Sequence, residues 1–213
     1  MPLSDRDYMK NPPPRRGSIK PGRRINYGGA NLNPVWTLIA VNFVFFIATI
    51  INSNIIGTLG LSPSHFAQRP WTLLTNMFVH EGFWHVFGNM ITLYFFGTFL
   101  NRLVGQNKFL LVYFAGGILG GILYVLLGAP YSIAIGASGA VYAVAGALAV
   151  MMPNLKVRLY FILPVPLWLV VLVFFVLWSF LPGIAWPAHL GGLAAGLIGG
   201  YFFRRRGGYY YQR

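Results

Sequence analysis

The sequence has no cysteine, and charged residues make up only 9% of its 213 positions. The absence of cysteine excludes disulfides, thiol catalysis and thiolate metal sites. Soluble domains carry roughly a quarter of their residues as charged side chains, far more than this chain does. Hydrophobic residues account for 56% of the sequence. The composition therefore predicts a polytopic membrane protein rather than a soluble domain.

Long apolar stretches divide the chain into candidate membrane spans, each near the length of about 20 residues that crosses a bilayer. The six expected helices cover residues 35–51, 84–103, 109–127, 138–152, 160–181 and 187–203. Asn33 followed by Pro34 predicts a capped start for the first helix. Between the first two helices, segment 66–78 is too short and polar to span, so we expect it in the membrane interface with Trp71 as an anchor. We predict an all-α, six-helix membrane domain over residues 34–203.

Positive charges collect on one side of this arrangement. Fifteen of the 16 Lys and Arg residues fall in the N-terminal segment 1–33, at the end of the second helix and in the turn after it, in the turn after the fourth helix, and in the C-terminal segment 204–213; Arg69 is the exception. By the positive-inside rule, both termini are expected in the cytoplasm. Segment 1–33 is expected to be a disordered basic tail, and 204–213 a second basic tail. Orientation in the lipid bilayer accounts for the net charge of +13, so no nucleic-acid partner is expected.

A serine between two glycines marks the start of the fourth helix. Gly136 and Gly139 flank Ser138 in the pattern Gly-x-Ser-Gly, which permits a tight turn and close approach of a substrate chain. A helix start also offers unpaired N–H groups and the positive end of the helix dipole to a developing oxyanion. This pattern is typical of a nucleophile, and equally of small-residue packing between membrane helices. The fourth helix would cover only roughly 22 Å, so Ser138 is expected below the membrane surface.

Three helices carry a polar residue near their outer ends. These residues are His85 and Asn89 in the second helix, Ser138 in the fourth and His189 in the sixth. Polar side chains are costly inside a bilayer and usually functional, although a single histidine can instead make a structural hydrogen bond between helices. Because the three helices run in the same direction, these residues are expected at a similar depth. They form one candidate site.

Small residues at intervals of about four predict close packing of the fourth and sixth helices. The two stripes are Gly139, Ala143 and Ala147 on the fourth helix, and His189, Gly192, Gly196 and Gly200 on the sixth. Helix packing alone does not explain why a serine lies at the outer end of one stripe and a histidine at the outer end of the other. Close packing is expected to bring Ser138 within hydrogen-bonding reach of His189, as the nucleophile and general base of a hydrolase.

Only three acidic residues are available to support such a pair. Asp5 and Asp7 fall in the N-terminal tail and Glu81 in a loop, so no aspartate completes a triad and a Ser-His dyad is expected. Tyr142, one turn after Ser138, is placed to pack against the histidine ring. Asn89, with His85, is expected to stabilise the oxyanion beside the Ser138 N–H. No metal or other cofactor is expected, since His80, Glu81 and His85 lack a further intramembrane carboxylate or thiolate partner.

These motifs together resemble the rhomboid family of intramembrane serine proteases. The matching pieces are His85-x3-Asn89, Gly136-x-Ser138-Gly139 with Tyr142, and Ala188-His189-x2-Gly192-x3-Gly196. The resemblance implies a six-helix bundle that cleaves transmembrane protein substrates with a Ser-His dyad, in a water-filled cavity open to the outer side. It also implies that the fifth helix and the loop after it gate substrate access. We expect a multi-pass protein of a prokaryotic plasma membrane, with the active site facing outward.

Two positions depart from the family pattern. Thr72 stands where the first loop usually has arginine, and Asn101 stands where the second helix usually ends with glutamate. Both departures concern local scaffold contacts rather than the chemistry.

Two other functions compete with proteolysis. One is a rhomboid-like pseudoprotease that binds membrane proteins without cleaving them; such proteins are expected to lack the serine or the histidine, and both are present here. The other is a small channel or transporter whose polar residues line a path. Reaction with a serine-directed probe distinguishes a protease from a channel.

Overall fold

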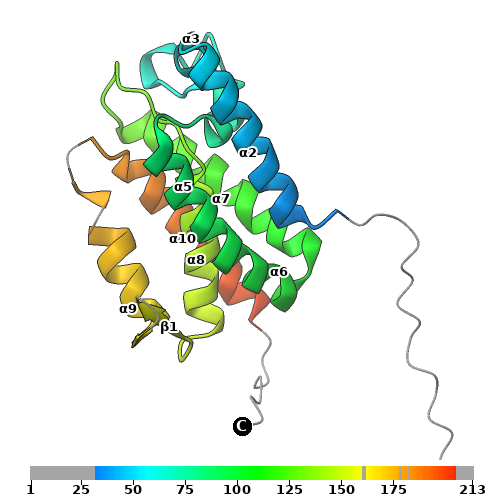
Figure 1. Ribbon diagram of the computed structural model, residues 1–213. Coiled ribbons are helices and arrows are strands. Elements are labelled where there is room, and N and C mark those ends of the chain that lie inside the picture. Colours follow the sequence, from blue (N-terminus) through cyan, green and yellow to red (C-terminus); the bar gives the residue numbers. More distant parts are fainter. Residues whose placement is uncertain (1–31, 160–161, 178, 182, 205–213) are drawn as a thin grey trace, which may run out of the picture. The chain divides into compact units, whose positions relative to one another are not determined.

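The computed structural model describes residues 32–159, 162–177, 179–181 and 183–204. Most of the expected basic tails, 1–33 and 204–213, lie outside the described residues, as does Tyr160, the expected first residue of the fifth helix. The described chain is mainly a bundle of helices (Figure 1).

The first long helix, α2, covers Pro34–Ile51 and begins as the sequence predicts. The Asn33 side chain accepts a hydrogen bond of 3.0 Å from the Val35 N–H, and proline occupies the first turn, where no N–H is needed. The connection after α2 contains only short helices. These are α3 (Asn54–Leu59), η2 (Pro63–His65), α4 (Thr72–Thr75) and η3 (Asn76–Phe78). None of the four is long enough to span a bilayer.

The second expected helix is continuous from Phe83 to Val104, through α5 (Phe83–Thr92), the π-helical turn η4 (Leu93–Gly97) and α6 (Thr98–Val104). It is followed by α7 (Gln106–Leu127), which has 22 residues. Among the described residues, α2 and α7 are the two single helices that are long and apolar enough to cross a membrane. Their lengths fit a bilayer core of about 30 Å.

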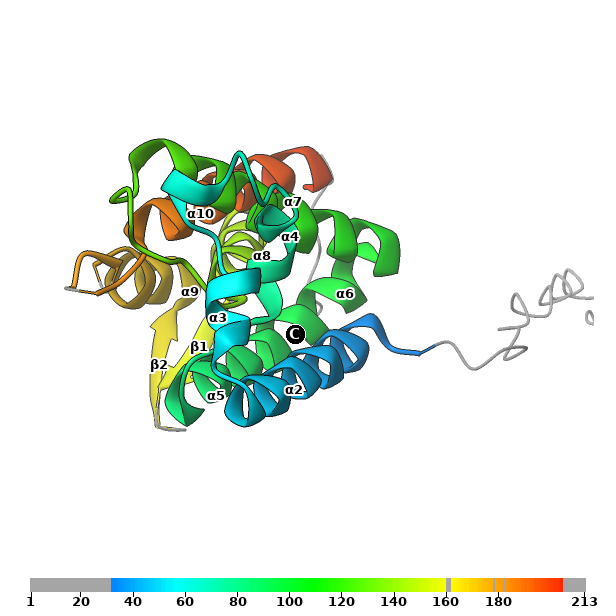
Figure 2. The same ribbon diagram turned by 90° about the horizontal axis from the view of Figure 1, so that it is seen from above.

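Helix α8 (Ser138–Met151) lies at the centre of the bundle (Figure 2). Every residue from Gly139 to Leu148 is buried. The helix packs against α7, α10 and η4. A helix that is apolar on all sides needs such complete enclosure. At 14 residues, α8 is about 21 Å long, shorter than a hydrocarbon core.

A short hairpin replaces the expected first turns of the fifth helix. Strand β1 (Lys156–Leu159) pairs antiparallel with β2 (Leu163–Pro166). Proline at 164 and 166 lacks the N–H that a helix interior requires, so helix α9 begins only at Leu167. It covers Leu167–Val170 and continues as the π-helix η5 (Val171–Leu177). The prediction of a helical start at 160, and of a chain without strands, is therefore wrong at this point.

The last helix, α10 (Trp186–Phe203), lies against α8 with almost no space between the two backbones. A methyl group added at Gly192 would overlap the Gly139 carbonyl oxygen, and one at Gly196 would overlap the backbone of Ala143. At Gly200 it would come within 2.7 Å of the Ala147 carbonyl oxygen. Glycine is the residue that allows this approach. The two small-residue stripes thus face each other.

Candidate active site

Backbone hydrogen bonds hold the segment before Ser138 in place. Leu61 and Ala134 form an isolated antiparallel bridge, with N–H to O distances of 2.9 and 2.8 Å. Farther along, the N–H of Gly136 donates to the Asn76 carbonyl at 2.9 Å. The connection between α2 and α5 therefore fixes the position at which α8 starts.

Gly136 is required by both conformation and space. Its φ angle is +107°, a region that other residues rarely adopt. A methyl group there would lie 2.5 Å from Nε2 of His85. The glycine on the other side of the serine, Gly139, faces Ala188 of α10, whose carbonyl oxygen would be 3.2 Å from an added methyl group. Larger residues at either position would disturb the approach of α5 or α10 to Ser138.

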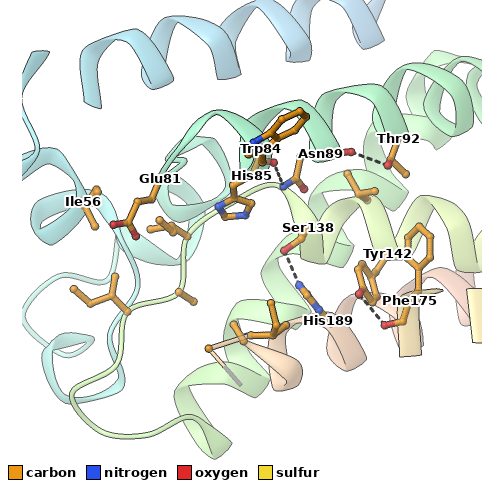
Figure 3. Close-up of a pocket in the computed structure, with 18 residues that line it drawn as sticks. Ile56, Glu81, Trp84, His85, Asn89, Thr92, Ser138, Tyr142, Phe175 and His189 are labelled. Atoms are coloured by element: carbon orange, nitrogen blue, oxygen red, sulfur yellow. Dashed lines mark hydrogen bonds between the residues drawn. The ribbon is translucent and has the colours of Figure 1, made fainter. Parts of the chain in front are cut away.

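The helix ends bring the serine and a histidine together. Ser138 is the first residue of α8, and His189 lies in the first turn of α10. The Ser138 Oγ and the His189 Nε2 are 2.8 Å apart (Figure 3). The Tyr142 ring stacks on the imidazole with centroids 4.1 Å apart and an interplanar angle of 23°. The pair is therefore preformed and its ring plane is held by an aromatic neighbour.

A serine that sequence reasoning missed contacts the other side of the imidazole. Ser179 is fully buried, and its Oγ is 3.0 Å from Nδ1 of His189. It is the only serine or threonine in the segment 160–181. A single hydroxyl in an apolar span is a signal that could have identified it.

The second helix supplies a polar wall opposite the serine. The Asn89 side chain donates through Nδ2 to the His85 carbonyl at 2.9 Å, which leaves the second N–H of that amide for another acceptor. The side chains of His85 and Asn89 line a cavity of about 710 Å³ that Ser138 and His189 also line (Figure 3). The cavity thus combines a hydroxyl–imidazole pair with amide and imidazole groups around one space.

His80 lies outside the long helices and fixes the residue before the serine. Its Nε2 accepts from the Ala137 N–H at 3.3 Å, while its Nδ1 lies 3.3 Å from the Phe78 carbonyl. A carbonyl only accepts, so Nδ1 carries the proton and the ring is neutral. Burial, together with the charge of nearby His85, lowers the pKa of His80 from 6.5 to about 3. Sequence analysis considered His80 only as an unsupported metal ligand.

This environment predicts a pH-dependent stability. Between pH 6.5 and 3, unfolded His80 binds a proton that folded His80 does not, so the free energy of unfolding should fall as the pH falls through this range. His80→Gln keeps a side-chain acceptor without the titration, and its thermal midpoint in detergent should decline less over the same range. Parallel declines in the two proteins would show that His80 is not responsible.

Of the two departures from the family pattern, Thr72 is buried and Asn101 is partly exposed. Thr72 begins α4, and its hydroxyl donates to the Arg69 carbonyl at 2.6 Å. The Oδ1 of Asn101 is buried without a hydrogen-bond partner within the described part of the chain. Neither residue lines the cavity that contains Ser138.

These observations define a helical protein with apolar spans, in which helix ends converge on a serine–histidine pair inside a cavity. A model of the Rhomboid domain matches residues 67–206, which include Ser138, His189, His85 and Asn89. The chain belongs to the rhomboid family of membrane proteins.

Curated relatives agree with this assignment. The chain is 31% identical over 163 residues to Rhomboid protein 1, mitochondrial, of Saccharomyces cerevisiae, a match that covers 67% of this chain and 44% of the yeast protein. It is 35% identical over 130 residues to Putative rhomboid protease YdcA of Bacillus subtilis, a match that covers 60% of this chain and 64% of that protein. Rhomboid protease GluP of the same bacterium is 42% identical over 78 residues, a match that covers 37% of this chain and 15% of GluP. The matched regions thus span less than two thirds of each relative.

Proposed function

We propose that this protein is an intramembrane serine endopeptidase in which Ser138 is the nucleophile and His189 the general base and acid. The observation that carries the proposal is the 2.8 Å contact between Ser138 Oγ and His189 Nε2 inside the cavity. Family membership and the names of the relatives support it. A pseudoprotease has no need of both reacting groups in hydrogen-bonding contact.

The geometry suits acyl transfer. As Ser138 Oγ bonds to the scissile carbonyl carbon, its proton passes to Nε2 of His189 and the carbonyl π electrons move to oxygen. When this intermediate collapses, the C–N bond breaks and Nε2 returns the proton to the leaving amine. Water then attacks the acyl-serine in the same way, giving a carboxylic acid and free Ser138.

The oxyanion needs donors that face the attacked carbonyl. The first turn of α8 has N–H groups without intrahelical acceptors, and the Ser138 N–H is one of them. Asn89 contributes the amide N–H not used by the His85 carbonyl. His85 lines the same cavity and supplies a further polar group. Charge that develops only in the transition state is stabilised best by such fixed donors.

Asn89→Ala should therefore reduce kcat about 100- to 1,000-fold, as expected when one oxyanion donor is lost. KM should change little because the donor binds the transition state more strongly than the ground state. Steady-state kinetics on a model transmembrane substrate measure both constants. A raised KM with an unchanged kcat would instead assign Asn89 to ground-state substrate binding.

The proposed topology has six spans with both termini in the cytoplasm, in the plasma membrane of a prokaryote. The distribution of Lys and Arg supports this orientation. It directs the N-terminal ends of α5, α8 and α10, and hence the cavity, towards the outer side. The proposed partners are transmembrane protein substrates within the lipid bilayer.

Substrates should then be cut near their outer membrane boundary. A helix in the bilayer has all its backbone groups paired, so the scissile segment must unwind before its carbonyl can be attacked. Glycine or proline placed at that boundary should accelerate cleavage. Mass spectrometry of the new termini of a model substrate locates the cut, and cuts confined to the cytoplasmic boundary would contradict the topology.

Labelling by a fluorophosphonate tests the chemistry without knowledge of the substrate. The wild-type protein should become labelled at Ser138, identified by peptide mass spectrometry, and His189→Ala should not. A protein that binds substrates without cleaving them, or one that transports solutes, would leave Ser138 unlabelled.

A further inference from the structure

The imidazole of His189 is bound on both of its nitrogens. Nε2 contacts the Ser138 hydroxyl at 2.8 Å, and Nδ1 contacts the Ser179 hydroxyl at 3.0 Å. A hydroxyl can either donate or accept, so these two distances alone do not define which nitrogen carries the proton.

A backbone carbonyl determines which group donates in each of these hydrogen bonds. The Ser179 Oγ lies 2.6 Å from the Phe175 carbonyl oxygen, which can only accept. Without a proton between them, two oxygen atoms would face each other at 2.6 Å with lone pairs alone. The Ser179 hydroxyl must therefore donate to Phe175, and its oxygen has only lone pairs left for Nδ1 of His189.

The Tyr142 hydroxyl does not provide an alternative donor. It donates to the same Phe175 carbonyl at 2.8 Å, so its single proton is also committed. Its 3.1 Å contact with Ser179 cannot redirect the Ser179 proton without breaking the shorter bond to the carbonyl. Tyr142 stacking holds the ring plane, but stacking does not distinguish one ring nitrogen from the other.

We infer that Ser179 is a positioning residue that holds His189 in the tautomer protonated on Nδ1, leaving Nε2 free to accept the Ser138 proton. The inference rests on the proposed function for its catalytic meaning. In the other tautomer, Nε2–H would donate to Ser138 and could not remove its proton. The hydroxyl of Ser179 thus takes the place that a carboxylate occupies in a Ser-His-Asp triad, where the third group orients the base.

The wild-type protein alone gives the first test. Nitrogen-15 NMR of histidine-labelled protein in nanodiscs distinguishes protonated from unprotonated ring nitrogens, and the His189 signals are identified by their loss in His189→Gln. The expected result is a proton on Nδ1 and none on Nε2. A proton on Nε2 would overturn the inference, whatever the activity of the protein.

Ser179→Ala gives the second test. Without the acceptor, His189 should redistribute towards the Nε2-protonated tautomer, and kcat should fall about tenfold while KM changes less than about twofold. The inference would be overturned if a folded Ser179→Ala protein kept the wild-type His189 tautomer and kcat. It would also be overturned if the substitution changed only KM.

Thr49→Ala is the matched control for a purely structural role. Thr49 is nearly buried in α2, and its hydroxyl donates to the Phe45 carbonyl four residues earlier at 2.9 Å, as Ser179 does to Phe175. The control should lose similar thermal stability without changing kcat or the His189 signals. If both variants lose only stability, Ser179 serves helix packing and the inference fails.

Failure of the proposed function has a different signature. If wild-type Ser138 resists fluorophosphonate, the protease proposal fails, while the NMR spectrum still decides the tautomer. If Ser138 reacts but His189 carries its proton on Nε2, the protease proposal stands and the role of Ser179 is excluded.

Discussion

Ser138→Ala and His189→Ala should each abolish cleavage while leaving a folded, membrane-inserted protein. Each change removes a reacting group in contact with the other at 2.8 Å. In serine proteases such losses cost about 10,000-fold or more in kcat. Because the two residues act as one unit, the double variant should be only slightly less active than either single variant. Cleavage of a model substrate, normalised to folded protein by circular dichroism, measures the effect.

A second serine–histidine contact provides the control. Ser64 Oγ lies 3.1 Å from Nδ1 of His65, but the pair is exposed and neither residue lines the large cavity. Ser64→Ala should retain wild-type activity and labelling. Substantial turnover by Ser138→Ala, or equal losses in both serine variants, would show that proximity to a histidine does not identify the nucleophile here.

The hydrophobic pattern, together with helix-capping and helix-breaking residues, predicted most of the helix positions. Asn33 and Pro34 predicted the capped start of α2, and the expected helix at 35–51 begins one residue after the observed start at Pro34, because capping and the missing proline N–H act locally. The expected start of the fourth helix at Ser138 also agrees with the structure. The error came at the fifth helix, where an apolar composition outweighed the prolines at 164 and 166, and the structure has a hairpin instead.

The contact between Ser138 and His189 could be predicted from the sequence because it depends on the spacing of small residues. Gly192 and Gly196 repeat at the interval of one helical face, which predicted the close approach that brings His189 to Ser138. Ser179 was missed for a geometric reason. Its side-chain partners, His189 and Tyr142, belong to other helices, α10 and α8, so no local pattern in the fifth segment shows the contact. His80 was undervalued because its partner, Ala137, is 57 residues away in sequence.

Gly196→Ala should cause a large loss of stability, whereas Gly199→Ala on the same helix should cause little. A methyl group at Gly196 would overlap the carbonyl oxygen, carbonyl carbon and Cα of Ala143, and backbone atoms of a packed helix cannot rotate away. The helices must separate, so we expect a loss of about 3 kcal/mol in the free energy of unfolding. At Gly199, the added methyl group would lie 3.4 Å from a Val112 methyl group.

The comparison isolates backbone contact from other effects of replacing glycine. Both variants gain the same intrinsic helix propensity, so Gly199→Ala should be neutral or slightly stabilising. Unfolding of the two proteins in increasing dodecyl sulfate, followed by circular dichroism, measures the difference. Gly196→Ala should also lower activity, because separating α10 from α8 moves His189 away from Ser138. Equal stability of the two variants would mean that the backbone approach of α10 to α8 does not hold the serine–histidine pair together.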